Sequence, residues 1–164
     1  MYASEYQRLA EARLKRHFDD VRVEWSVVEA ATDALRRDVH RYAPRVDIAI
    51  GPFNTTPGPD SEIDERLLPR GLLELFSDRP PNPNPRCLLA IEVVFSGSSK
   101  PIMGDTLNAG AHGLYGLVVG TEARMRKIQR IGTYLQVLAD LEKLPPMFRN
   151  VVVLSTVEFD ELFD

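Results

Sequence analysis

The stretch CLLAIEVVF, residues 87–95, is apolar at every position except Glu92. A continuous apolar run of this length, followed by the polar turn SGSS at 96–99, predicts a β-strand that is buried on both faces. An ionised carboxylate that leaves water without a compensating partner costs several kcal/mol. Glu92 is therefore expected to have either a structural partner or a function.

The segments around this strand indicate how it is packed. A second continuous apolar run, YGLVVG at 115–120, follows a segment at 102–113 that is expected to be helical. Two apolar strands joined by a helix are typical of parallel neighbours in the middle of a sheet. Alternating or apolar patterns predict further strands at 21–28, 46–50 (ended by Gly51 and Pro52) and 150–157.

Helical periodicity is clearest at the two long polar-apolar segments, 5–18 and 122–142. A helix is also expected at about 62–77, weakened by Pro69 and Gly71. Residues 29–40 could be a short helix or a long turn, and the acidic tail EFDELFD, 158–164, is expected to fray. These elements predict an α/β fold with a central mixed β-sheet flanked by helices on both sides. We expect one domain, 1–164, with a Pro-rich insertion at about 53–86.

Composition narrows the class of protein. The 164 residues are 44% hydrophobic and 27% charged, which suits one soluble globular domain. There is no apolar run long enough to span a membrane and no apolar region typical of a signal peptide. The single cysteine, Cys87, lies in the apolar strand, so a reducing, cytoplasmic location is expected. The net charge of −4 argues against non-specific coating of nucleic acid but allows a local basic face.

Two acids and one lysine suggest a metal-dependent reaction. Asp47 follows PRV at the start of one strand, Glu92 interrupts another, and Lys100 follows the SGSS turn. Hard cations such as Mg²⁺ take oxygen ligands, often one or two carboxylates, and a bound metal activates water and offsets phosphate charge. A lysine ammonium can stabilise the transition state of phosphodiester cleavage.

The PRVD…IEVV…K arrangement resembles the PD-(D/E)XK nuclease superfamily, which has the restriction-endonuclease-like fold. The resemblance implies a Mg²⁺- or Mn²⁺-dependent nuclease acting on DNA, with Asp47 and Glu92 as the two acids and the carbonyl of Val93 as a further metal ligand. It also implies a supporting glutamate on the first helix, either Glu5 or Glu11, of which Glu5 is preferred. The simplest pattern of the family has a lysine where this chain has Val94, so Lys100 would have to take that role.

Further residues could contact the substrate. A basic group in the first turns of the helix at 122–142 could bind phosphates, and Asn108 could line a substrate groove on a shared helical face with Asp105 and His112. The basic group consists of Arg124, Arg126, Lys127 and Arg130. The Pro-rich insertion could be a substrate clamp, the arm of a homodimer, or only a tolerated insertion.

Each of these residues also has a structural interpretation. Asp47 could pair with Arg45, Glu92 could pair with a core arginine, Lys100 could be a solvated loop residue, and the basic group could be a solvated helix face. The alternatives to a nuclease are a catalytically degenerate nucleic-acid-binding module with the same fold and a structural protein whose acids form buried ion pairs.

Overall fold

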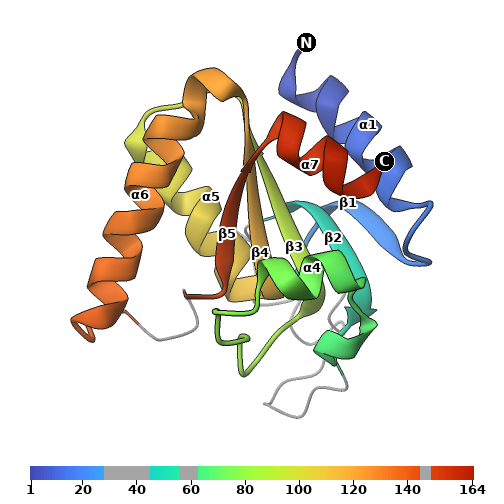
Figure 1. Ribbon diagram of the computed structural model, residues 1–164, viewed down its shortest axis with the longest axis horizontal. Helices are drawn as coiled ribbons and strands as arrows, with labels where there is room; N and C mark the ends of the chain where they lie inside the picture. The colour runs from blue at the N-terminus through green and yellow to red at the C-terminus, as the bar shows by residue number, and fades with distance from the viewer. Residues whose placement is uncertain (28–44, 56–62, 145–148) are drawn as a thin grey trace, which may run out of the picture.

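The computed structural model describes residues 1–27, 45–55, 63–144 and 149–164. These residues form an α/β fold with one five-stranded mixed sheet and helices on both of its faces (Figure 1). The elements, in chain order, are α1 (Ala3–Leu14), β1 (Val21–Trp25), β2 (Val46–Phe53), the 3₁₀ turn η1 (Glu65–Leu67), α4 (Arg70–Leu75), β3 (Cys87–Val94), α5 (Ser99–His112), β4 (Gly113–Gly120), α6 (Glu122–Asp140), β5 (Val151–Ser155) and α7 (Thr156–Phe163).

The strands lie in the order β1-β2-β3-β4-β5. β2 is antiparallel to both β1 and β3, whereas β3, β4 and β5 are parallel to one another. The predicted parallel pairing of 87–95 with 115–120 is confirmed, and Glu92 lies opposite Val118 in it. β3 is therefore the central strand, with an antiparallel neighbour on one side and a parallel neighbour on the other.

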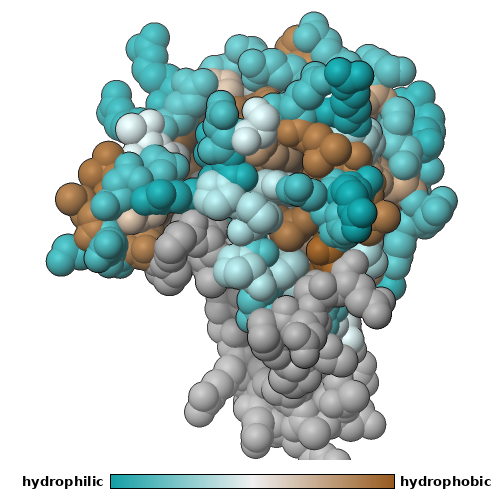
Figure 2. Space-filling view, turned by 60° about the horizontal axis from the view of Figure 1, so that its bottom comes forward, coloured by the Kyte–Doolittle hydropathy of each residue, from teal (hydrophilic) through white to brown (hydrophobic). Residues whose placement is uncertain are grey.

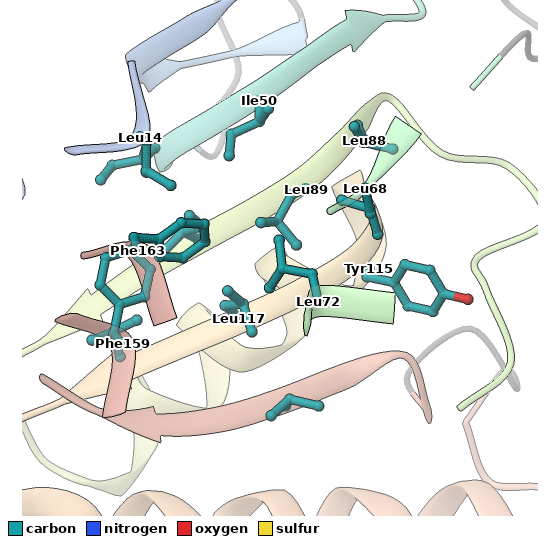
Figure 3. Close-up of a cluster of buried hydrophobic side chains, with 14 of the residues drawn as sticks. Leu14, Ile50, Leu68, Leu72, Leu88, Leu89, Tyr115, Leu117, Phe159 and Phe163 are labelled. Carbon is teal, nitrogen blue, oxygen red and sulfur yellow. The ribbon is translucent and has the colours of Figure 1, made fainter. Parts of the chain in front are cut away.

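One face of the sheet packs against α1, α4 and α7. Ile50, Leu89 and Leu117 come from three adjacent strands and lie in one cluster of buried side chains (Figure 3). The helices contribute Leu14, Leu72, Phe159 and Phe163 to the same cluster. This larger core joins α1 to α7.

The other face packs against α5 and α6. Val94, Val118 and Val151 of the sheet lie against apolar residues of the two helices, namely Ile102, Ala109, Ile128, Ile131 and Leu135. Side chains alternate between the two faces of a strand, so Glu92 points to the same face as Val94. The carboxylate of Glu92 is thereby directed toward α5.

The position of α5 is fixed by a close approach to β4. A Cβ atom added at Gly116 would lie 2.9 Å from the carbonyl carbon of Ala109, so the helix backbone rests directly on the strand. Two buried asparagines hold the end of the helix: the Nδ2 groups of Asn82 and Asn150 both donate to the carbonyl of Gly110, at 3.2 and 3.1 Å. This packing sets where the side chains of α5 meet β3.

The acidic tail is a helix, so the expectation that it frays is wrong. Ser155 and Glu158 form a capping box at the start of α7, and Phe159 and Phe163 are fully buried. Asp160 accepts hydrogen bonds from the hydroxyl of Tyr6 at 2.8 Å and from Arg13 at 2.6 Å. Apolar burial and these contacts with α1 outweigh the fraying expected at a chain end.

Other boundaries also differ from those expected. β2 continues through Gly51 and Pro52 to Phe53 with an irregular register, so these two residues do not end the strand. The helix expected at 62–77 is divided at Pro69 into η1 and α4, because proline cannot continue a helix. Residues 29–40 lie outside the described residues.

The surface carries separate apolar patches among polar residues (Figure 2). One patch lies over the C-terminal part of α6, where Val137 and Leu141 are exposed. Among the helices that the structure describes, none combines the length and the apolar character needed to cross a bilayer.

The contact between α5 and β4 makes a specific prediction for stability. Gly116→Ala should lower the free energy of unfolding by about 1–3 kcal/mol, since the backbone of Ala109 must shift to admit the methyl group. Gly104→Ala is the matched control, because nothing lies within 4 Å of the added carbon, and it should stabilise α5 by about 0.5–1 kcal/mol. Urea denaturation measures both, and similar effects at the two positions would contradict the close approach.

Candidate functional site

Asp47 and Glu92 lie opposite each other on adjacent antiparallel strands. β2 and β3 pair Ile48 with Ile91 and Ala49 with Ala90, and the next step of this register places Asp47 opposite Glu92. Side chains at directly opposed positions have Cβ atoms about 4.5–5.5 Å apart. The backbone N–H of Val93 donates to Oδ2 of Asp47 at 2.7 Å and so fixes this carboxylate against β3.

A third acid, Glu24 of β1, lies on the other side of Asp47, and Glu24, Asp47 and Glu92 together form what we call the carboxylate row. Glu24 lies between Val23, which pairs with Ile48, and Trp25, which pairs with Val46, so it is opposite Asp47. Its φ of 49° is in the left-handed region, which is uncommon for residues other than glycine. Like charges in directly opposed positions destabilise a sheet, so three acids on three adjacent strands are an unfavourable arrangement for structure alone.

Two amide side chains support the row. Gln7 of α1 donates through Nε2 to the carbonyl of Asp47 at 3.0 Å and to Oε1 of Glu24 at 3.3 Å. Asn108 of α5 donates through Nδ2 to Oε1 of Glu92 and, at 2.8 Å, to the carbonyl of Arg45. The acids are thus oriented by a helix on each side of the sheet.

Burial raises the pKa values of these acids. Glu92 is only 4% exposed, and its burial, together with the nearby charges of Asp47 and Asp105, raises its pKa to about 9 against the hydrogen bond from Asn108. Burial also raises the pKa of Asp47, and the N–H of Val93 and a hydrogen bond with the Glu92 carboxyl partly offset this rise. Asp105, one turn before Asn108, has a pKa raised to about 6 by burial and by the charge of Asp47.

The ion pairs considered as structural interpretations are not found in the described part of the chain. Neither Asp47 nor Glu92 forms a salt bridge with a described lysine or arginine, and Arg45 contributes a backbone carbonyl to Asn108. The two carboxylates therefore meet each other without a described cation between them.

The arrangement is suited to a divalent cation held by two carboxylates. Mg²⁺ is commonly bound by one or two protein carboxylates, with waters and substrate oxygens in the remaining positions. Among the described residues there is no group of three or more His, Cys, Asp or Glu side chains that could hold a metal ion. Asp47 and Glu92 would accordingly be the protein ligands, and water and substrate would complete the shell.

Glu5 and Glu11, the two glutamates expected to support the site, have partners within their own helix. Glu5 accepts from the backbone N–H of Tyr2 at 2.8 Å and caps α1, while Glu11 pairs with Lys15 at 2.6 Å. Gln7 of the same helix contacts the backbone carbonyl of Asp47. Val93 contributes an N–H to Asp47.

Lys100 is exposed in the first turn of α5. It precedes Asn108 by eight residues, which is about 12 Å along the helix axis. The structure describes no hydrogen bond between Lys100 and either acid. The residue at the usual lysine position, Val94, is 2% exposed and belongs to the core beneath α5 and α6.

The basic group lies at the start of α6 rather than beside the acids. Arg126 and Arg130 are exposed, Arg124 is half-buried, and Nζ of Lys127 lies 3.5 Å from the carbonyl of Gly97. This contact places the basic end of α6 next to the loop between β3 and α5.

Sequence reasoning missed Gln7 and Glu24. Gln7 follows the buried Tyr6 and lies at the edge of the apolar stripe of α1, where a neutral amide gives no signal of a metal site. Glu24 is a polar residue in an alternating strand, and only the register of β1 with β2 reveals that it faces Asp47.

Comparison with known proteins adds no relative: no protein-family model, curated protein or solved structure matches this chain.

The raised pKa of Glu92 predicts how stability depends on pH in metal-free buffer. The ordinary pKa of about 4.5 applies to the unfolded chain, and between about pH 5 and 9 the folded state retains a proton that the unfolded state has released. The free energy of unfolding should therefore fall as pH rises, by up to about 1.4 kcal/mol per pH unit.

Glu92→Gln should be more stable than the wild type at pH 8 and should lose most of this pH dependence. Glu161→Gln, at an exposed position of α7, should keep it. Urea denaturation at several pH values in the presence of a chelator measures the slopes. An unchanged slope in Glu92→Gln would show that the Glu92 carboxyl is not protonated in the folded protein.

Proposed function

We propose that this protein is a Mg²⁺- or Mn²⁺-dependent phosphodiesterase that acts on DNA and has a restriction-endonuclease-like fold. The observation that carries the proposal is the direct opposition of Asp47 and Glu92 on β2 and β3, with no described cation in contact with either. An arrangement that destabilises the metal-free protein is readily explained if a divalent cation normally lies between the two carboxylates.

Each residue of the site has a defined part in this proposal. Asp47, oriented by the N–H of Val93, and Glu92, oriented by Asn108, would hold the cation. When bound, the cation would lower the pKa of a coordinated water and offset charge on the phosphate. Gln7 donates hydrogen bonds to the Glu24 carboxylate and to the backbone carbonyl of Asp47.

The order of the elements also supports the proposal. A leading helix, an acid at the start of β2, an acid on the adjacent strand β3 and the following pair α5 and β4 match the arrangement implied by the resemblance to PD-(D/E)XK nucleases. The basic end of α6 lies next to the loop that follows β3, so it could contact the phosphates of a bound DNA.

One observation favours a second candidate function, a nucleic-acid-binding module that has lost catalysis. Val94 is buried where the family's lysine is usual, and Lys100 is exposed two turns of helix away from Asn108. Such a protein would retain the carboxylate pair and the basic surface but would not cleave DNA.

Metal binding should be visible as a gain in stability. At a Mn²⁺ concentration of 100 times Kd the folded state should gain about 2.7 kcal/mol, which corresponds to a rise of several degrees in Tm. Asp47→Asn should abolish this rise while leaving the metal-free protein as stable as the wild type or more stable, because it removes a largely buried charge near those of Glu24 and Asp105. A buried ion pair predicts instead a loss of about 3–5 kcal/mol.

Asp19→Asn is the matched control, since Asp19 is exposed outside the site, and it should respond to Mn²⁺ as the wild type does. Differential scanning calorimetry with and without Mn²⁺ makes the comparison. A wild type whose Tm does not move at millimolar Mn²⁺ would contradict the metal site.

Catalysis tests the role of Lys100. If its ammonium stabilises the transition state, Lys100→Ala should reduce DNA cleavage by about 10²–10³ while the Mn²⁺-induced rise in Tm is retained. Lys143→Ala, at an exposed position after α6, should cleave as the wild type does. Equal cleavage by Lys100→Ala and the wild type would exclude a catalytic role for Lys100. A wild type that binds Mn²⁺ and DNA without cleaving would identify the binding module.

A further inference from the structure

Among the strands that the structure describes, β5 lies at an edge of the sheet. β5 pairs only with β4 in the described structure, and the N–H of Gly116 donates to the carbonyl of Asn150 at 3.0 Å. In a parallel ladder, alternate residues direct their N–H and C=O groups to the same neighbour. The backbone N–H and C=O groups of residues 150, 152 and 154 therefore point toward β4, whereas those of Val151 and Val153 point away from it.

A groove runs along this edge. It has a volume of about 340 Å³ and is formed by the backbone side of β5 and the facing surface of α6. Both outward-pointing residues, Val151 and Val153, line it. Its polar side chains are Arg79, Gln129, Thr133 and Gln136, together with the buried Thr106 of α5.

A glycine in the middle of α6 keeps the groove open. Gly132 lines the groove, and glycine at an internal helix position destabilises a helix relative to alanine. Close packing does not require it, since an added Cβ would meet only Cγ2 of Val153, at an ordinary 3.7 Å. Because Gly132 has no side chain, the groove beside β5 has room for a ligand.

Arg79 provides a positive charge in the lining of the groove. Its Nη1 donates to the carbonyl of Arg149 at 3.2 Å, and it forms no salt bridge with a described carboxylate. The side chain is half-buried and also lines an adjoining cavity of about 380 Å³. The charge of Asp78 lies near the guanidinium but does not form a salt bridge with it, so Arg79 can still bind an anionic ligand at this position.

We propose that the groove between β5 and α6 binds an extended peptide segment of a partner protein, which pairs with Val151 and Val153 as a sixth strand and places an acidic side chain against Arg79. Alternating N–H and C=O groups on a strand edge complement a peptide backbone, and this mode of recognition is known as β-strand addition. Nucleic acid offers no such backbone, and the groove has one arginine rather than a basic cluster. The site is separate from the carboxylate row and does not depend on its activity.

The test uses a phage-displayed library of random seven-residue peptides selected against the full chain. Two variants alter the groove by different means: Gly132→Leu fills it, and Arg79→Gln removes the charge. Gly132→Ala is the matched control because it adds only one methyl group. Each variant's fold is checked by its Tm and its ¹H–¹⁵N spectrum, and metal binding at Asp47 and Glu92 should be unchanged in all three.

We expect selected peptides that contain an aspartate or glutamate and that shift the amide resonances of Val151 and Val153 in the wild type. Binding should weaken at least about tenfold in Gly132→Leu and in Arg79→Gln, and changing the acidic residue of the peptide to its amide should have the same effect as Arg79→Gln. Gly132→Ala should bind within about twofold of the wild type.

Three results would overturn the proposal. The first is a selection that yields no peptide, or only peptides whose binding is the same in Gly132→Leu. The second is a wild type that dimerises in solution and becomes monomeric in Gly132→Leu, since a second copy would then occupy the edge. The third is a single-stranded DNA oligonucleotide that binds the wild type and loses affinity in Arg79→Gln, which would make the groove a nucleic-acid site.

Discussion

The central strand β3 has to satisfy two demands at once: both of its faces are buried, and one of its side chains is an acid. Its antiparallel ladder with β2 brings Asp47 opposite Glu92, while its parallel ladder with β4 positions the helix that covers Glu92. α5 packs directly on Gly116, and two buried asparagines bind its C-terminal end. Together these contacts determine where Asn108 meets the carboxylate of Glu92. The environment of Glu92 is therefore determined by packing on both strands that neighbour β3.

Much of the fold could be predicted because its elements carry strong local patterns. The strands at 87–95 and 115–120 are continuous apolar runs, and the helix at 122–142 has a regular apolar face, so their types and their parallel pairing were predictable. The α/β class followed from their order. The opposition of Asp47 and Glu92 was harder to predict, because more than thirty residues separate β2 from β3 and only the backbone register relates the two positions.

The errors have identifiable physical causes. The last helix was missed because acidic residues near a chain end suggested fraying, although the pattern Ser155-x-x-Glu158 is that of a capping box and Phe159 and Phe163 are one helical turn apart. The partners of the carboxylates, Gln7 and Glu24, come from elements distant in sequence, and neither residue type is unusual for a helix or an edge strand. Such contacts depend on tertiary packing and have no local signal.

The contact between α1 and α7 has a consequence for folding during synthesis. Tyr6 and Arg13 find their partners at Asp160, about 150 residues later, and the cluster around Phe159 and Phe163 includes Leu14. During synthesis, which proceeds from the N-terminus, α1 therefore emerges from the ribosome long before the helix that covers it. Until α7 is released, the apolar stripe of α1, Tyr6, Ala10 and Leu14, can pack against β1, β2 and β3 but lacks the cover of Phe159 and Phe163, so part of the stripe stays available to chaperones.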